Sequence, residues 1–445
     1  MNKRNLTTGS IPLRLFQLTL PMMLGIISMV AFNLVDTYFV GQLGKTELAA
    51  LSYTFPIIMV VFSIVQGLGI GATALISKSI GAGNKAKAAR ETTDSLILTI
   101  LFTGAFTMVG LFTLQPVLRL LGADGATAEL STQYMNIWFF ALFFVSIPFV
   151  GNSAIRSTGD AQTPTYIMLF AVIVNAILDP ILIFGYVGFP VLGMRGAAIA
   201  TAVSRALTMV LSIYVLVKRE KLITFVLPSQ GVVSGCWRAI LNIALPSGLA
   251  RLVVPIATAA ITAMLSSYGE SAVAAFGVGS RIEFLASSLI FALAASIGPF
   301  VGQNIGKGQF SRVNQAVTIS NWFAVLWGLF SWALLALLAT PIAIIFNKNQ
   351  EVVDTVVLFL CIVPAGFGLQ GVLSVINSNL NTINKPMHAS LIIAAQMLIV
   401  GLPMIFVGKS LLGVKGIFIG LALTYIIGGL MSLVVNRKVM QSFSI

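Results

Sequence analysis

The two halves of this chain repeat one pattern. Matching residues stand at a constant spacing of 225 positions over about 60 residues, and the match then resumes in order at a spacing of 220. The matched positions are Leu20-Pro21 with Leu245-Pro246, Gly44 with Gly269, Ala49-Ala50 with Ala274-Ala275 and Ile80-Gly81 with Ile305-Gly306, then Gly193 and Gly196 with Gly413 and Gly416. Chance rarely holds one register over such a length, so the pattern indicates an internal duplication.

The composition places this duplicated chain in lipid. Hydrophobic residues make up 58% of the sequence and charged residues only 9%, against about 25% charged in an average soluble domain. So little polar surface cannot cover a water-soluble particle of 445 residues. A duplicated half in such an apolar chain is typical of transporters.

Twelve apolar stretches are long enough to cross about 30 Å of hydrocarbon, which takes roughly 20 residues of helix. The predicted spans are 12–40, 48–76, 93–117, 131–155, 164–187, 196–217, 238–267, 272–301, 314–345, 353–380, 387–408 and 414–436. All must be helices, because lipid cannot satisfy unpaired backbone groups. The predicted fold is therefore all-α and integral to the membrane, with an N-lobe (1–218), a linker (219–237) and a C-lobe (238–445). Six spans in each lobe make the repeat parallel.

The basic residues predict the orientation. With the N-terminus in the cytoplasm, seventeen of the 26 Lys and Arg residues fall in inner segments and six in outer loops. This bias places both termini inside, and it explains the net charge of +13 by inner loops that face anionic lipid, without a nucleic-acid partner. The short outer loops hold no glycosylation acceptor, which favours a bacterial inner membrane.

No motif in the chain indicates an enzyme or an ATP-driven pump. Gly44-Lys45-Thr46 resembles the end of a phosphate loop, but Phe39 occupies the position of the required upstream glycine. The single histidine, His388, excludes a histidine-based metal site or triad, and two cysteines suggest neither a disulfide framework nor a metal cluster. We therefore expect no cofactor and no firm metal site, and an ion gradient as the energy source.

Buried carboxyl groups are the strongest functional signal. An ionised Asp at the bilayer centre costs at least about 2.5 to 3.5 kcal/mol, so such residues are functional candidates. Asp36 and Asp179 lie well within spans, Asn175 is one helical turn before Asp179, and Thr201 lies just inside the sixth span. All four fall in the outer half of the N-lobe. We predict one polar pocket formed by Asp36, Asn175, Asp179 and Thr201.

Such a pocket can couple transport to a proton or a sodium ion. Desolvation and like charge both oppose ionisation of two neighbouring carboxyl groups, so the pair can exchange a proton near neutral pH. A structural alternative is that Asp36 forms an ion pair with Arg205, which lies one turn beyond Thr201 on the same helix face.

The duplication supplies an internal control. Asp36 corresponds to Ile261 and Asp179 to Ile399, so the scaffold does not itself need either acid. The second half has Glu283 and Arg251 near mid-membrane on adjacent spans, and we expect them to form a structural ion pair rather than a second coupling site. Arg281 lies in the same region, and the sequence assigns it no role.

Four further residues carry predictions, three in the first span and one in the fourth. Pro21 removes a backbone hydrogen bond 15 residues before Asp36, which allows either a bend that responds to protonation or a fixed kink. Broad substrate cavities are lined by adaptable Met and aromatic residues, and Met29, Asn33 and Asn152 are the candidates for lining the cavity here.

The chain resembles the multidrug and toxic compound extrusion (MATE) family over nearly its whole length. The motifs that carry the resemblance are the Leu20-Pro21 opening, DTYFVGQLG from Asp36 to Gly44, GATALISKSIGAG, GDAQTP from Gly159 to Pro164, Asn175 with Asp179-Pro180, and GMRGAAIAT from Gly193 to Thr201. By this resemblance, Asp36, Asn175, Asp179 and Thr201 match the N-lobe cation site of the DinF-like branch. The NorM-like branch has an acid in its seventh span, soon after the proline, and another in its tenth, whereas here neither the rest of the seventh span after Pro246 nor the interior of the tenth span contains an acid.

The resemblance implies a secondary antiporter that exports amphiphilic, often cationic compounds in exchange for protons or sodium. The expected partners are these small molecules, the coupling ion and membrane lipid, and the expected state is a monomer. The alternative of a lipid-linked precursor flippase calls for a strongly cationic cavity, to which only Arg205, Arg251 and Arg281 contribute. A membrane-embedded enzyme is disfavoured because nucleophile motifs and substantial soluble loops are lacking.

Overall fold

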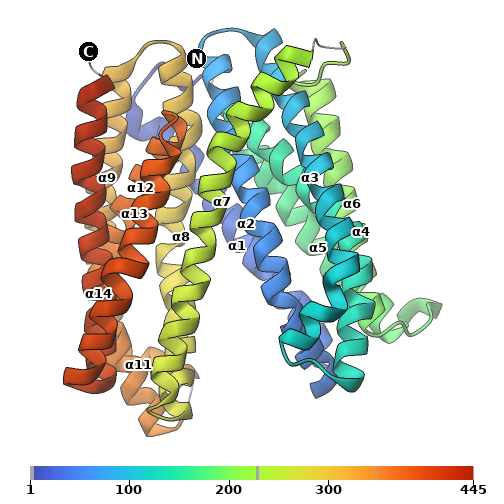
Figure 1. The fold of residues 1–445 in the computed structure, drawn as a ribbon, viewed down its shortest axis with the longest axis vertical. Helices are drawn as coiled ribbons and strands as arrows, with labels where there is room; N and C mark the ends of the chain where they lie inside the picture. Colours follow the sequence, from blue (N-terminus) through green and yellow to red (C-terminus); the bar gives the residue numbers. More distant parts are fainter. Residues whose placement is uncertain (1–4, 227–229, 347, 444–445) are drawn as a thin grey trace. The chain divides into compact units, whose positions relative to one another are not determined.

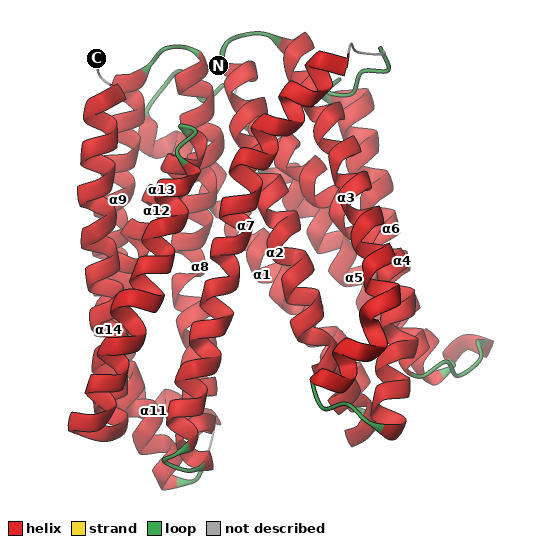
Figure 2. Ribbon diagram, viewed as in Figure 1, coloured by secondary structure: helices red, strands yellow, loops and turns green. Residues whose placement is uncertain are grey.

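The computed structural model describes residues 5–226, 230–346 and 348–443. Two predictions lie partly outside these residues: Lys3 and Arg4, which contribute to the orientation, and positions 227–229 of the linker. Within the described residues the secondary structure is helical, and Figure 2 shows helices and loops but no strand. Lipid explains this, because a helix pairs its backbone groups within one segment.

The first repeat forms six long helices, labelled in Figure 1. They are α1 (Ile11–Gly41), α2 (Lys45–Gly81), α3 (Lys85–Leu120), α4 (Gly125–Ser157), α5 (Gln162–Phe184) and α6 (Met194–Tyr214). A 3-10 turn, η1 (Tyr186–Gly188), follows α5, and a π-helical turn, η2 (Val215–Arg219), extends α6. Each helix is long and apolar enough to cross a membrane.

The second repeat uses more, shorter segments. They are α7 (Gln230–Ser266), α8 (Glu270–Gly306), α9 (Phe310–Leu337), α10 (Ala339–Phe346), α11 (Gln350–Ile362), η3 (Val363–Gly366), α12 (Phe367–Thr382), α13 (Pro386–Ala394), η4 (Ala395–Gly401) and α14 (Leu402–Phe443). The tenth span combines α11, η3 and α12, because Pro364 interrupts the regular α-helix there.

The last two spans form one continuous helical run, Pro386–Gln441, that reverses at Gly413. Gly413 has φ 60° and ψ −136°, a conformation that favours glycine. A Cβ atom at Gly408 would collide with the carbonyl group of Gly416, although eight residues of straight helix rise about 12 Å. The chain therefore folds back on itself, and the described residues hold the twelve predicted spans.

The seventh helix begins earlier than the sequence predicts. We expected a linker from 219 to 237, but α7 starts at Gln230. The indole Nε1 of Trp237 donates to the backbone carbonyl of Asp94 on α3 at 3.0 Å. This contact fixes the added helical turns against the first repeat, which hydropathy alone does not reveal.

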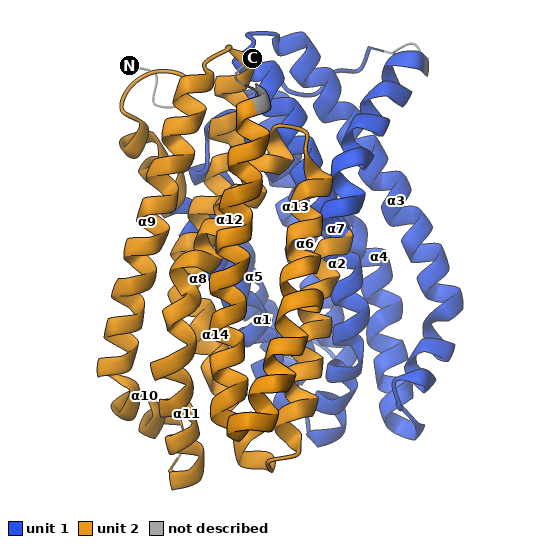
Figure 3. Cartoon of the chain, turned by 60° about the vertical axis from the view of Figure 1, so that its left-hand side comes forward, with its two compact units in different colours: residues 1–6, 21–248 blue, residues 7–20, 249–445 orange. Residues whose placement is uncertain are grey.

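The compact units of the structure differ from the two sequence repeats (Figure 3). Unit 1 is built around Pro21–Gly248, and unit 2 comprises Thr7–Leu20 and Leu249–Ile445. Helices α1 and α7 therefore each belong to both units. The change occurs at Pro21 in α1 and two residues after Pro246 in α7, so the repeated prolines mark the places where the two helices pass from one unit to the other.

Contacts within each unit explain this exchange. In unit 2, the start of α1 is held to α8 by Thr19 and Ser296, whose hydroxyl oxygens are 3.2 Å apart. In unit 1, the start of α7 lies so close to α2 that a Cβ atom at Gly67 would collide with the carbonyl group of Ala244. Small residues allow such close approach of helices in membranes.

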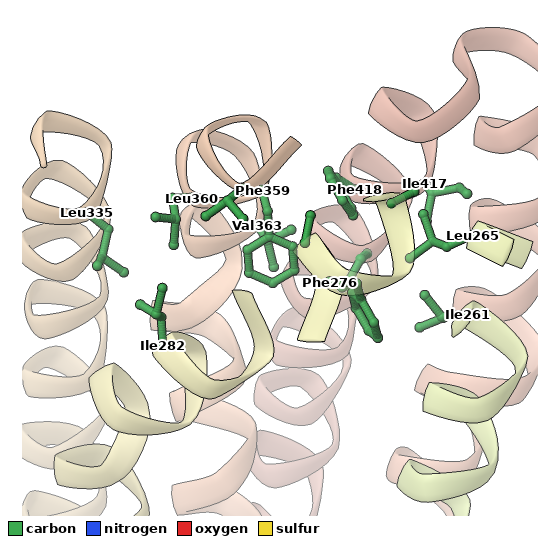
Figure 4. Close-up of a cluster of buried hydrophobic side chains, with 14 of the residues drawn as sticks. Ile261, Leu265, Phe276, Ile282, Leu335, Phe359, Leu360, Val363, Ile417 and Phe418 are labelled. Carbon is green, nitrogen blue, oxygen red and sulfur yellow. The ribbon is translucent and has the colours of Figure 1, made fainter. Parts of the chain in front are cut away.

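Each unit has its own apolar core. In unit 1, α4 packs against α2, α3 and α6. In unit 2, α12 packs against α8, α9 and α14, and an apolar cluster gathers side chains from α7, α8, α11 and α14 (Figure 4). Ile261, the counterpart of Asp36, belongs to this cluster and is 4% exposed.

Candidate functional site

The four residues predicted to form the pocket lie in unit 1 and form two bonded pairs. On α5, the amide Nδ2 of Asn175 donates to Asp179 Oδ1 at 3.0 Å. Between α6 and α1, the hydroxyl of Thr201 donates to Asp36 Oδ1 at 3.4 Å. All four side chains are buried.

The two pairs belong to one electrostatic cluster. Helix α5 packs along α6, and Asp36 lies within Coulombic range of Asp179. The helical spacing of Asn175 and Asp179 places both on one face of α5, and Pro180 follows within the same helix. The structure therefore brings together two carboxyl groups, an amide and a hydroxyl from three helices.

Two oxygen atoms of this cluster have no hydrogen-bond partner among the described residues. They are Asn175 Oδ1 and Asp179 Oδ2, and both are buried. A buried acceptor without a partner costs about 1 to 3 kcal/mol. A proton on Asp179, or a cation bound by oxygen ligands, removes that cost. The described residues hold no cluster of three or more His, Cys, Asp or Glu side chains suited to a transition metal.

Tyr134 on α4 is a member of the cluster that the sequence analysis missed. It is 3% exposed, and its hydroxyl faces Thr201 within Coulombic range of Asp36 and Asp179. A buried Tyr hydroxyl usually finds a polar partner. This preference is the signal by which the sequence could have suggested Tyr134 as a member. The sequence does not show, however, which face of α4 points toward α6.

Arg205 does not form the ion pair with Asp36 that the structural alternative required. Its guanidinium lies over the ring of Phe32, 4.0 Å from the centroid, and its Nη1 is 4.0 Å from Met168 Sδ. Asp36 influences Arg205 through space only. A flat guanidinium stacks well on an aromatic face, which explains why Phe32 holds it.

Pro21 lies inside the continuous helix α1 and has an unusual partner. The hydroxyl of Thr165 on α5 donates to the Pro21 carbonyl at 2.6 Å. Gly25 lies beside this hydroxyl, and a Cβ atom there would stand 3.4 Å from it, at van der Waals contact. Helix α5 is thus bonded to α1 at the position where α1 changes unit.

The three cavity candidates have different environments. Asn33 is exposed and Met29 is partly buried on α1. Asn152 is buried, and its carbonyl oxygen accepts a hydrogen bond from Ser212 at 3.3 Å. That bond joins α4 to α6 beside Gly151, where a Cβ atom would lie 2.8 Å from Ser212 Oγ. Asn152 therefore helps to join α4 to α6, and its role in lining the cavity stays a prediction.

The ion pair expected in the second repeat is absent from the described residues of unit 2. Glu283 accepts a hydrogen bond from the hydroxyl of Tyr425 at 2.7 Å instead of pairing with Arg251. Arg251 and Arg281 are both exposed, and no carboxylate pairs with either of them. The prediction was wrong because similar depth on adjacent helices does not fix which faces meet.

Ile399 is not the structural counterpart of Asp179. Asp179 is fully buried, whereas Ile399 is 72% exposed. The π-helix η4 spans this position, and its wider turn changes the face on which each following side chain lies. The buried polar residue there is Gln396, whose Nε2 donates to Gln370 Oε1 at 2.7 Å.

Comparison with known proteins fits these observations. The family model for MatE matches residues 21–181 and 246–407, one stretch in each repeat. The chain belongs to this family. A solved structure of the Vibrio cholerae MATE transporter VcmN in the bent form has a TM-score of 0.92 and 31% identity, and the match covers 97% of each chain.

Two curated relatives differ in what they carry. The FAD transporter of Shewanella oneidensis is 34% identical over 429 residues, which cover 96% of this chain and 95% of the relative. The multidrug export protein MepA of Staphylococcus saprophyticus is 25% identical over 404 residues, which cover 90% and 87%. The relatives therefore include transporters named for different classes of compound.

Proposed function

We propose that this protein is a secondary active exporter of amphiphilic organic compounds, coupled to a proton or sodium gradient through the pocket of Asp36, Asn175, Asp179 and Thr201. The observation that carries the proposal is the pair of buried oxygen atoms without partners, Asn175 Oδ1 and Asp179 Oδ2. A proton on Asp179 can give these two oxygen atoms a hydrogen bond without the fixed set of ligands that a metal ion needs. We therefore favour the proton as the coupling ion. The family's multidrug exporters support the substrate class.

The coupling step follows from the contacts between α1 and α6. Ionised Asp36 accepts a hydrogen bond from the hydroxyl of Thr201. Protonation of Asp36 turns one of its carboxyl oxygens into a hydrogen-bond donor. The changed bond alters how α1 packs on α6. Pro21 lies 15 residues earlier, where α1 lacks one backbone bond and passes between units, so α1 bends there as the proton binds and leaves.

The direct test measures export of ethidium, a cationic dye, in everted vesicles, where efflux from the cytoplasmic face appears as uptake of the dye into the vesicle. A pH gradient and a sodium gradient are imposed separately on the same preparation. We expect efflux to follow the pH gradient and to collapse when a protonophore removes it. Efflux that needs sodium and ignores pH would reassign the same pocket to sodium, and efflux that ignores both gradients would reject secondary coupling.

The proposed location is a bacterial inner membrane with both termini in the cytoplasm. Cysteines placed at Lys45 and Ser271, at the starts of α2 and α8, should react with an impermeant thiol reagent from outside. Cysteines at Lys85 and Lys307 should react only from inside. Labelling of the cysteines at Lys45 and Ser271 from opposite sides would overturn the parallel arrangement of repeats.

A second candidate substrate is a flavin dinucleotide, favoured by Arg251 and Arg281. An arginine in an apolar span is costly unless it faces water or a counter-ion. Among the described residues, neither Arg251 nor Arg281 has a carboxylate partner. The diphosphate of FAD can accept the paired hydrogen bonds of a guanidinium, and one relative is an FAD transporter.

Substitution at these arginines separates the two candidates. If FAD is the substrate, the double variant R251Q/R281Q should lose FAD uptake into everted vesicles and keep ethidium uptake, while R251K/R281K keeps part of the FAD uptake. Unchanged FAD export in R251Q/R281Q, or none in the wild type, would remove this candidate.

A further inference from the structure

Arg205 adds a fixed positive charge beside the proposed coupling pocket. It lies one helical turn after Thr201 on α6, and Phe32 lies one turn before Asp36 on α1. The two helices therefore meet in two adjacent contacts, Thr201 with Asp36 and Arg205 with Phe32. Arg205 is 9% exposed, so little solvent screens its charge.

No carboxylate in the described part of the chain neutralises Arg205 by direct contact. Its charge is permanent, because a guanidinium does not lose its proton in proteins. The titratable groups that face it are Asp36 from α1 and Tyr134 from α4. Asp179, from α5, completes the set through its interaction with Asp36. The charge of Arg205 therefore belongs to the pocket as a whole.

The total charge of this pocket determines how many cations it takes. With both carboxyl groups ionised and Tyr134 neutral, two negative charges face one positive charge. A buried site of low dielectric disfavours net charge. We propose that Arg205 sets the coupling ratio: it balances one carboxylate permanently, so that the pocket binds and releases one cation in each cycle instead of two.

The second repeat shows that the scaffold does not need this arginine. At the repeat spacing of 220, Arg205 corresponds to Tyr425 and Thr201 to Leu421. Both belong to the same apolar cluster as Ile261, the counterpart of Asp36. Where the acid is absent, the guanidinium is absent too. If Arg205 balances the charge of an acid, a repeat without the acid should also lack the arginine, as the second repeat does. A role in packing alone would not require the two to be absent together.

The inference rests on the proposed function and is tested by counting cations per dye. Purified protein in weakly buffered detergent binds ethidium while a pH indicator records released protons and isotopic sodium records released sodium. We expect about one cation per ethidium for the wild type and about two for R205M, whose thioether can still pack on Phe32. R205K retains the charge and should stay near one.

A rescue variant makes the test independent of how R205M itself behaves. D179N alone removes one negative charge, leaves the pocket neutral and should release close to no cation. D179N/R205M restores a single net negative charge and should release about one. R205Q replaces R205M in both backgrounds if the methionine variant does not fold, as judged by gel filtration.

The outcomes separate the two claims. A wild type that exchanges one cation, with the same count in R205M and no rescue in D179N/R205M, would overturn the role of Arg205 and leave the coupling pocket intact. A wild type that exchanges no cation, with efflux unaffected by D36N, would overturn the proposed function and this inference with it.

Discussion

Equivalent positions of the two units have opposite chemistry. In unit 1, α1 and α6 meet through Asp36 and Thr201, which are bonded at 3.4 Å. In unit 2, the corresponding residues Ile261 and Leu421 both belong to an apolar cluster (Figure 4). The same helical scaffold therefore accepts either polar or apolar contacts at this depth. The acid in unit 1 is costly there without a function, which is the reason to place coupling in unit 1.

The largest effect is expected when the acid is transferred to unit 2. I261D places an unpaired carboxyl in the apolar cluster, and we expect it to destabilise unit 2 by about 3 to 5 kcal/mol. Thermal unfolding in detergent measures the change, with I261V as the control at about 1 kcal/mol. A variant I261D as stable as I261V would show that unit 2 holds hidden polar partners for an acid, and the contrast between units would fail.

A smaller effect is expected for the carboxyl group that unit 2 does possess. Glu283 has one described partner, the hydroxyl of Tyr425, and no ion pair with Arg251. E283Q keeps a hydrogen-bond acceptor, so we expect a loss of only about 0.5 to 1.5 kcal/mol. R251Q should likewise cost little. Destabilisation of about 3 kcal/mol or more in either variant, the amount for a broken buried pair, would restore the ion pair that the structure lacks.

The smallest effect concerns the bond that holds α1 at its change of unit. T165V removes the hydroxyl that donates to the Pro21 carbonyl while keeping the side-chain shape. We expect stability to fall by about 1 kcal/mol and the pH dependence of efflux to become less steep, because α1 bends more freely. T132V on α4, whose hydroxyl donates only to the carbonyl of Ala128 one turn earlier in the same helix, serves as the control. Identical pH profiles for T165V and wild type would indicate that this bond does not govern the bend.

Much of the fold could be predicted because lipid leaves few alternatives. Apolar length defined the spans, and the repeat defined their grouping, so even the reversal at Gly413 fell between two predicted helices. The start of α7 at Gln230 could not be predicted, since it depends on the contact between Trp237 and α3. The exchange of α1 and α7 between units has the same origin in tertiary contacts.

The candidate site could be predicted in part for a similar reason. Helical spacing placed Asn175 beside Asp179, and depth placed Asp36 level with Thr201. Which faces of neighbouring helices meet is set by side-chain packing, and the sequence does not encode it simply. This is why the ion pairs considered for Arg205 and Glu283 do not form and why the sequence analysis missed Tyr134. The π-helix η4 changed the helical phase at Ile399, which no spacing rule anticipates.

The most direct test of coupling in unit 1 alone compares D36N with E283Q in everted vesicles. Efflux of ethidium is recorded under an imposed pH gradient and divided by the amount of folded protein. We expect D36N to lose gradient-driven efflux by about tenfold or more, because the amide keeps the shape but cannot exchange a proton, while E283Q remains close to wild type. Efflux near the wild-type rate in D36N, together with its loss in E283Q, would move coupling to unit 2.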